Sequence, residues 1–173
     1  MVTAVYKGVE CVLGVHGGSG YLFAFYPPKQ GTVSEGARID LVERITSDPS
    51  RRYGVQDLFS YGYLGFALHP SGKKLFYLTG GPITLRNGER LRGKESTAKG
   101  ESKGIENLHL VSYDLESDVR KDYGAIFFGN RPGFPNYVNS IAVSDDCVYA
   151  LTRLGYAPDD GSDARTVLMQ IKL

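Results

Sequence analysis

The chain of 173 residues has no tryptophan and only two cysteines, Cys11 and Cys147. Two thiols cannot form a disulfide framework or a four-thiolate zinc site, and we expect neither a metal nor a cofactor. Both cysteines lie in apolar runs, which predicts buried and unreactive thiols. The 20 basic and 19 acidic residues give a net charge of +1, which argues against a general nucleic-acid binder with its dominant basic field.

Long apolar runs are missing as well. No stretch approaches the roughly 18 apolar residues of a membrane helix, so we expect no membrane partner. The first ten residues lack the basic segment, the apolar segment and the cleavage site of a signal peptide. The compartment stays open, with an extracellular or periplasmic location slightly favoured.

Helical periodicity is nearly absent, and the chain instead holds many short apolar runs. These runs are rich in Val, Ile, Leu, Phe and Tyr, and they alternate with clusters of Gly, Pro, Asn, Asp and Ser. The pattern predicts an all-β chain of about eleven strands, with no helix longer than about two turns.

Three segments of the chain repeat one another. "AVYKGVECVLGVHGG", "ALHPSGKKLFYLTGG" and "AVSDDCVYALTR" begin at Ala4, Ala67 and Ala142, and each predicts two strands around a tight turn. A third predicted strand begins at Leu22, Leu110 and Leu168. In two of the three units a fourth strand follows, around residues 38–45 and 119–127. The alignment places Cys11 beside Cys147, and His16 beside Thr79 and Thr152.

Four-stranded units at this spacing predict β-propeller blades, with a β-sandwich as the alternative. The blades would span residues 1–45, 61–127 and 137–173, and the last would lack its fourth strand. "FALHPSGKKLFYLTGG" followed by "LHLVSYDLES" resembles the blade repeats of bacterial propellers of the quinoprotein-like, YncE-like and oligogalacturonate-lyase-like groups. The resemblance implies the fold alone, because the lyase group's metal-binding histidine cluster is not recognisable here.

The predicted loops divide into a short set and a long set. The turns between first and second strands are short, whereas the connections at the other end include residues 46–62, 80–107, 128–137 and 153–165. Long loops on a rigid scaffold commonly carry binding sites. The glycine-rich residues 17–20 form one of these connections, and we interpret them as a bend, since no helix follows to complete a phosphate site.

The long-loop end therefore holds the candidate ligand-binding residues. Aromatic rings and amides there suit a glycan or another small polar ligand, because a ring can stack on a sugar face and an amide can bond its hydroxyls. The candidates are His16, Arg52, Tyr61, Glu106, Asn107, His109, Tyr137, Asn139 and Arg153.

Three functions are compatible with these features. The first is a binding or scaffold module for a polar ligand, a glycan or a protein partner. The second is a polysaccharide lyase or hydrolase at the same channel mouth, although no motif joins the candidates into a catalytic set. The third is a self-assembling structural subunit.

Three blades cannot close a ring, so we expect the chain to associate. Either earlier blades of a longer protein complete the ring, or identical chains join, for example as two chains in a six-bladed ring. The unpaired strand edges and apolar flanks would drive this association.

Overall fold

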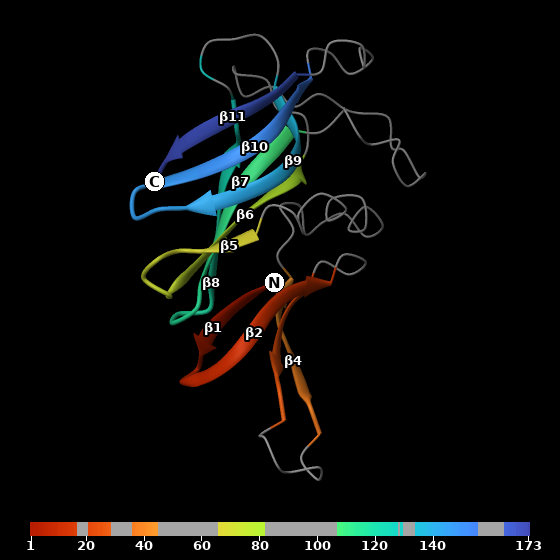
Figure 1. Ribbon diagram of the computed structural model, residues 1–173, viewed down its shortest axis with the longest axis vertical. Coiled ribbons are helices and arrows are strands. Elements are labelled where there is room, and N and C mark those ends of the chain that lie inside the picture. Colours follow the sequence, from red (N-terminus) through yellow and green to blue (C-terminus); the bar gives the residue numbers. More distant parts are fainter. Residues whose placement is uncertain are drawn as a thin grey trace.

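Figure 1 shows a computed structural model of the chain. It describes residues 1–16, 21–28, 36–44, 66–81, 107–127, 129, 134–155 and 165–173. These residues form eleven strands and no helix, which confirms the predicted all-β fold. The strands are β1 (Val2–Tyr6), β2 (Val9–His16), β3 (Tyr21–Tyr26), β4 (Arg38–Arg44), β5 (Phe66–Leu68), β6 (Lys74–Gly81), β7 (Asn107–Asp114), β8 (Val119–Ala125), β9 (Phe134–Val143), β10 (Cys147–Gly155) and β11 (Arg165–Lys172).

The strands form three antiparallel sheets that follow the order of the chain. The first sheet has the order β1-β2-β3-β4, the second β5-β6-β7-β8, and the third β9-β10-β11. The described residues thus give the third sheet three strands, as the repeat predicts. In Figure 1 the first sheet lies at the bottom, the second in the middle and the third at the top. No helix among the described residues is long and apolar enough to cross a membrane.

Tight turns join the first two strands of each sheet. Between β1 and β2 the turn residues Lys7 and Gly8 both have positive φ, at 51° and 78°. Two positive φ values in a two-residue connection match the right-handed twist of the flanking strands, as in a type I′ turn. Between β5 and β6, Gly72 has φ 73°, and its N–H donates to the carbonyl of His69.

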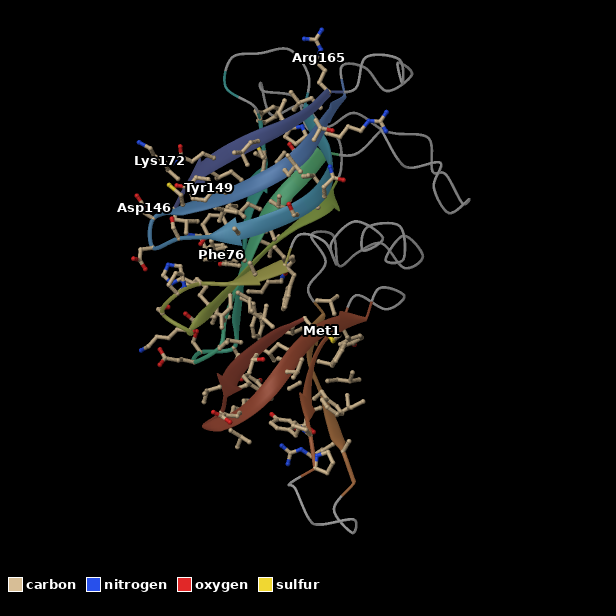
Figure 2. The ribbon with its side chains drawn as sticks, viewed as in Figure 1. Met1, Phe76, Asp146, Tyr149, Arg165 and Lys172 are labelled. Carbon is tan, nitrogen blue, oxygen red and sulfur yellow. The ribbon has the colours of Figure 1, made fainter. Side chains whose placement is uncertain are left out.

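The second sheet is buried on both faces because it lies between the other two. Strand alternation sends Leu75, Tyr77, Val111 and Tyr113 toward the first sheet and the intervening residues toward the third. The first junction also contains Ala4, Tyr6, Cys11, Leu13, Leu22 and Ala24. The second junction is built from Phe76, Leu78, Leu108, Leu110, Val138, Val148, Ala150 and Met169. Figure 2 shows Phe76 between the second and third sheets.

The first strands of neighbouring sheets also contact each other. β1 contacts β5, and β5 in turn contacts β9. Both cysteines are free and buried, as predicted, and burial raises the pKa of the Cys11 thiol. The short turns that join β1 to β2, β5 to β6 and β9 to β10 lie at one end of the stacked sheets (Figure 1).

Candidate functional site

The structure places six of the nine candidate residues on strands. His16 ends β2, Asn107 begins β7, His109 follows in β7, Tyr137 and Asn139 lie in β9, and Arg153 lies in β10. The other three, Arg52, Tyr61 and Glu106, lie outside the described residues.

The described candidates do not gather at one point. Tyr137 and Arg153 are cross-strand partners in the third sheet. Arg153 is exposed, and its strand position faces away from the second sheet. His109 shares a face of β7 with Val111, and that face packs on the first sheet. His109 therefore lies between the first and second sheets, whereas Arg153 lies on the outer face of the third.

At the long-loop end, the side chain of His109 contacts the carboxylate of Asp122. Its side chain is buried, at 6% exposure, and Nδ1 lies 3.2 and 3.3 Å from the two oxygens of Asp122 on β8. A bulge in β8 brings Asp122 to this position, since His109 pairs with Ala125 and Val111 pairs with Asp122. The backbone N–H of Gly124 donates to the same carboxylate at 2.7 Å and holds it in place.

The electrostatics of this pair favour an ionised carboxylate. Burial acts to raise the pKa of Asp122, but the hydrogen bonds from His109 and Gly124 outweigh it, and the pKa lies below its ordinary value. Because an ionised carboxylate only accepts, Nδ1 of His109 donates to Asp122, and in the singly protonated ring Nε2 carries the lone pair. Nε2 is buried and has no hydrogen-bond partner among the described residues.

A second buried polar group lies in the third sheet. Thr152 is fully buried, and its hydroxyl has no hydrogen-bond partner within the described ranges. It occupies the position of His16 in the repeat and pairs with Val138 and Val167 on the adjacent strands. A buried polar group usually finds a partner in protein or water, so the two groups are candidate positions for a further hydrogen bond.

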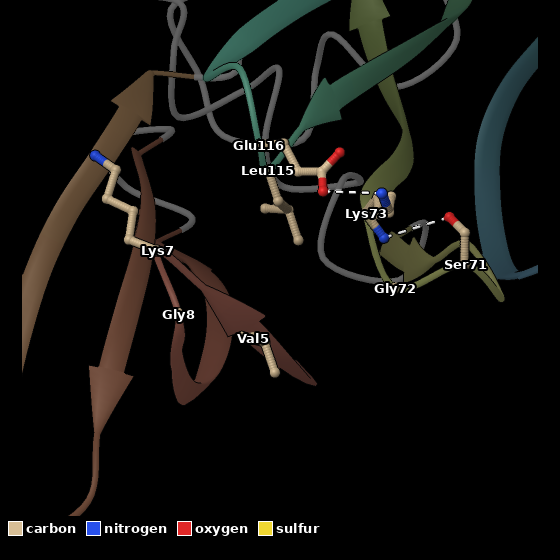
Figure 3. A pocket seen from close by; sticks show the side chains of 8 residues that line it. All are labelled: Val5, Lys7, Gly8, Ser71, Gly72, Lys73, Leu115 and Glu116. Atoms are coloured by element: carbon tan, nitrogen blue, oxygen red, sulfur yellow. Dashed lines mark hydrogen bonds and ion pairs between the residues drawn. The ribbon is translucent and has the colours of Figure 1, made fainter.

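The opposite end of the stack carries a groove between the short turns of the first and second sheets (Figure 3). Its volume is about 480 Å³, and its lining residues are Val5, Lys7, Gly8, Ser71, Gly72, Lys73, Leu115 and Glu116. Both lysines are ion-paired, Lys7 with Asp118 at 3.0 Å and Lys73 with Glu116 at 2.9 Å. The lysines of this groove are therefore neutralised by ion pairs, and the groove offers little positive charge to an anionic ligand.

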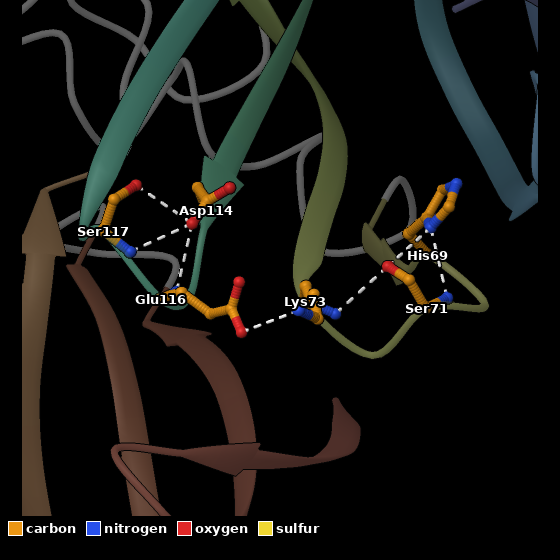
Figure 4. Close-up of polar contacts among 6 residues, drawn as sticks. All are labelled: His69, Ser71, Lys73, Asp114, Glu116 and Ser117. Carbon is orange, nitrogen blue, oxygen red and sulfur yellow. Dashed lines mark hydrogen bonds and ion pairs between the residues drawn. The ribbon is translucent and has the colours of Figure 1, made fainter.

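Polar contacts around this groove shape the turns (Figure 4). Asp114 accepts hydrogen bonds from the backbone N–H of Ser117 and of Glu116 and from the Ser117 hydroxyl, which together hold its pKa below the ordinary value. The N–H of Ser71 donates to Nδ1 of His69. Nε2 of His69 then carries the proton and donates to the carbonyl of Asp145 in the third sheet at 3.2 Å.

Sequence reasoning named His109 as a candidate but did not name Asp122. The carboxylate lies 13 residues further along the chain, across a hairpin whose bulge decides which residue faces the histidine. The glycine at 124, with φ 89°, was the available signal, because glycine inside a predicted strand often marks a bulge. In the part of the chain that the structure describes, no three His, Cys, Asp or Glu side chains could hold a metal ion together.

Comparisons with known proteins give no relative. No family model matches the chain, and neither a curated protein nor a solved structure is identified as similar to it.

Proposed function

We propose that the chain is a binding module of propeller-type blades whose long-loop end holds a polar ligand, in particular a glycan. The observation that carries the proposal is the buried His109, which Asp122 orients and whose Nε2 has no partner among the described residues. The contacts between β1, β5 and β9 further support blades, whose first strands meet around a central channel.

A hydroxyl group is the partner that best suits this nitrogen. In the neutral ring Nε2 accepts a hydrogen bond, and a sugar hydroxyl can donate one while its own oxygen remains free to accept another. Asp122 and Gly124 hold the ring in place before a ligand arrives, which lowers the entropy cost of binding. Tyr61 and Tyr137 remain the predicted stacking partners for the sugar ring.

The same pair supports a second candidate, a polysaccharide hydrolase or lyase. A histidine whose Nδ1 donates to a carboxylate is the arrangement that general bases use, with Nε2 free to accept a proton. The pair would then need an acidic partner from the long loops, for which Glu106 is the predicted residue.

Calorimetric titration with oligosaccharides of galacturonate, glucose and N-acetylglucosamine tests the proposal. Replacing the ring by His109→Phe, or the carboxylate by Asp122→Asn, should weaken binding about three- to tenfold, the worth of one hydrogen bond. Glu116→Gln is the matched control, since Glu116 lies in the turn between β7 and β8, at the opposite end of the second sheet from His109. Binding that survives His109→Phe unchanged, or no binding by any of the three series, would contradict the proposal. Release of reducing ends or unsaturated sugars would favour the enzyme.

A further inference from the structure

The repeat places a leucine at an equivalent position in each sheet, and its exposure changes only in the last. Leu22 and Leu110 are 0% and 4% exposed, because each faces the following sheet. Leu168, their counterpart in β11, is 68% exposed. The equivalent leucine is thus buried in the first two sheets, whereas in the third sheet it lies on a face that the described residues leave uncovered.

A second set of equivalent residues lies on the opposite face of each sheet. These residues are buried in the second and third sheets, and in the first sheet the residue faces outward. Val111 and Met169 are 0% and 3% exposed, and each faces the preceding sheet. Their counterpart Phe23 faces outward from the first sheet. It pairs across the strands with Leu41, which is 68% exposed, and the next such pair is Phe25 with Ile39, which is 62% exposed.

These residues define two apolar surfaces at the ends of the stack. The outer face of the first sheet contains Val5, Val12, Phe23, Phe25, Ile39 and Leu41. The outer face of the third sheet contains Tyr149, Leu151 and Leu168, with the polar residues Ser140, Thr166 and Gln170 beside them. Apolar surface of this kind on a sheet commonly marks an interaction site.

The shape of the first surface suits another sheet. The ring of Phe23 lies over Gly14, since a Cβ atom added at Gly14 would be only 2.5 Å from Phe23 Cζ. The equivalent residue in the second sheet is Tyr77, which is fully buried against the first sheet. The Phe23 ring therefore fills the space over Gly14, as the Tyr77 side chain does at the equivalent position between the first and second sheets.

We propose that the outer face of the first sheet binds the outer face of the third sheet in a second copy of this chain. At each internal junction, one sheet packs the face that is directed toward the next sheet along the chain, and that next sheet packs the face that is directed back. Among the described residues, the third sheet leaves a face of the first kind uncovered and the first sheet leaves a face of the second kind uncovered. A contact between copies would therefore repeat the internal junction, and two such contacts would close a six-sheet ring with twofold symmetry.

Charge favours this pairing over a contact between two first sheets. The exposed Glu10 is the cross-strand partner of Val5 and shares the outer face of the first sheet. Exposed Lys172 shares the outer face of the third sheet and, like Glu10, lies at the short-turn end of its sheet. Unlike charges meet in the proposed contact, whereas two first sheets would bring together copies of Glu10.

Sedimentation velocity of the full chain and of two variants at micromolar concentration tests the contact. Leu168→Glu alters only the third sheet's outer face, and Leu41→Glu alters only the first sheet's. Both side chains are 68% exposed, so neither change buries a charge within one copy. Val119→Glu is the control, because Val119 is 56% exposed in β8 of the middle sheet and lies on neither surface.

The wild type and Val119→Glu should sediment as dimers, and each of the other variants alone as a monomer. An equimolar mixture of Leu168→Glu and Leu41→Glu should recover dimer through one contact, between the unaltered first sheet of the Leu168→Glu copy and the unaltered third sheet of the Leu41→Glu copy. A monomeric wild type would overturn the proposal. So would a Leu168→Glu variant that stays dimeric while Leu41→Glu dissociates, since that result indicates contact between two first sheets.

Discussion

The hydroxyl of Tyr6 in the first sheet donates to Oδ1 of Asp118, 112 residues further along the chain, at 2.7 Å. Asp118 lies in the turn between β7 and β8 with φ 56°, and it also accepts from Tyr113 at 3.0 Å. His69 occupies the position of Tyr6 in the repeat, and it donates to the third sheet through Asp145. One equivalent position thus joins each sheet to the next at the short-turn end.

Removing the Tyr6 hydroxyl should loosen the first junction. Tyr6→Phe loses one hydrogen bond while the ring still packs, so the free energy of unfolding should fall by about 0.5–1.5 kcal/mol. Urea denaturation followed by circular dichroism measures the change. Tyr123→Phe is the control, since its hydroxyl contacts Ser112 within one sheet and is partly exposed. Equal effects of the two changes would contradict a special role for Tyr6.

Acid should destabilise the fold through its aspartates. Burial acts to raise the pKa of Asp118, but hydrogen bonds from Tyr6, Lys7 and Tyr113 outweigh it and hold the pKa below the ordinary 3.8. A lowered folded-state pKa gives stability that is present above the unfolded-state value and is lost as the pH falls through the folded-state value. The free energy of unfolding should therefore decline below about pH 4.

Asp118→Asn separates this contribution from general acid effects. The variant should be less stable than the wild type at neutral pH, and its stability should fall less steeply on acidification. Asp145→Asn, which alters an exposed carboxylate at the same end of the stack, should keep the wild-type slope. An unchanged slope in Asp118→Asn would show that the carboxylate carries no pH-linked stability.

The equivalent leucines should differ sharply when truncated. Leu110→Ala opens a cavity between two sheets and should cost about 2–5 kcal/mol of unfolding free energy. Leu168→Ala, measured at dilution where the chain is monomeric, should change stability by no more than about 0.5 kcal/mol. Comparable losses at the two positions would mean that Leu168 is covered within one copy.

Gly14→Ala should separate folding from association. The added methyl group would displace the Phe23 ring, which lies at the partly exposed outer face and can turn away. The free energy of unfolding of the monomer should change by less than about 1 kcal/mol. The dimer should dissociate at a higher protein concentration than the wild-type dimer does. Thermal melts and sedimentation at several concentrations measure the two effects. If association is unaltered, the Phe23 ring is not part of the contact between copies.

The sequence predicted most of the fold because the repeat and the strand alternation are local patterns. Alignment of the segments at Ala4, Ala67 and Ala142 placed the strands in three sheets, and it also identified equivalent residues such as Leu22 and Leu168. Alternation then decides which residues face a neighbouring sheet. Both patterns survive in the structure with little change.

The polar contacts between and within sheets could not be predicted in the same way. The pairing of His109 with Asp122 depends on a bulge, and the contact of Tyr6 with Asp118 depends on a positive φ and on the distance between two sheets. Neither follows from periodicity. Periodicity placed His109 and Arg153 at the long-loop end of their strands, but it did not show that His109 faces the first sheet whereas Arg153 lies on the outer face of the third.

The protonation of His109 is the most direct test of the proposed site. Nitrogen-15 NMR of the histidine side chains at neutral pH distinguishes a protonated ring nitrogen from one with a free lone pair. The account predicts a proton on Nδ1, a lone pair on Nε2, and a shift of the Nε2 resonance when a binding oligosaccharide is added. A protonated Nε2, or a resonance that does not move under saturating oligosaccharide, would contradict it.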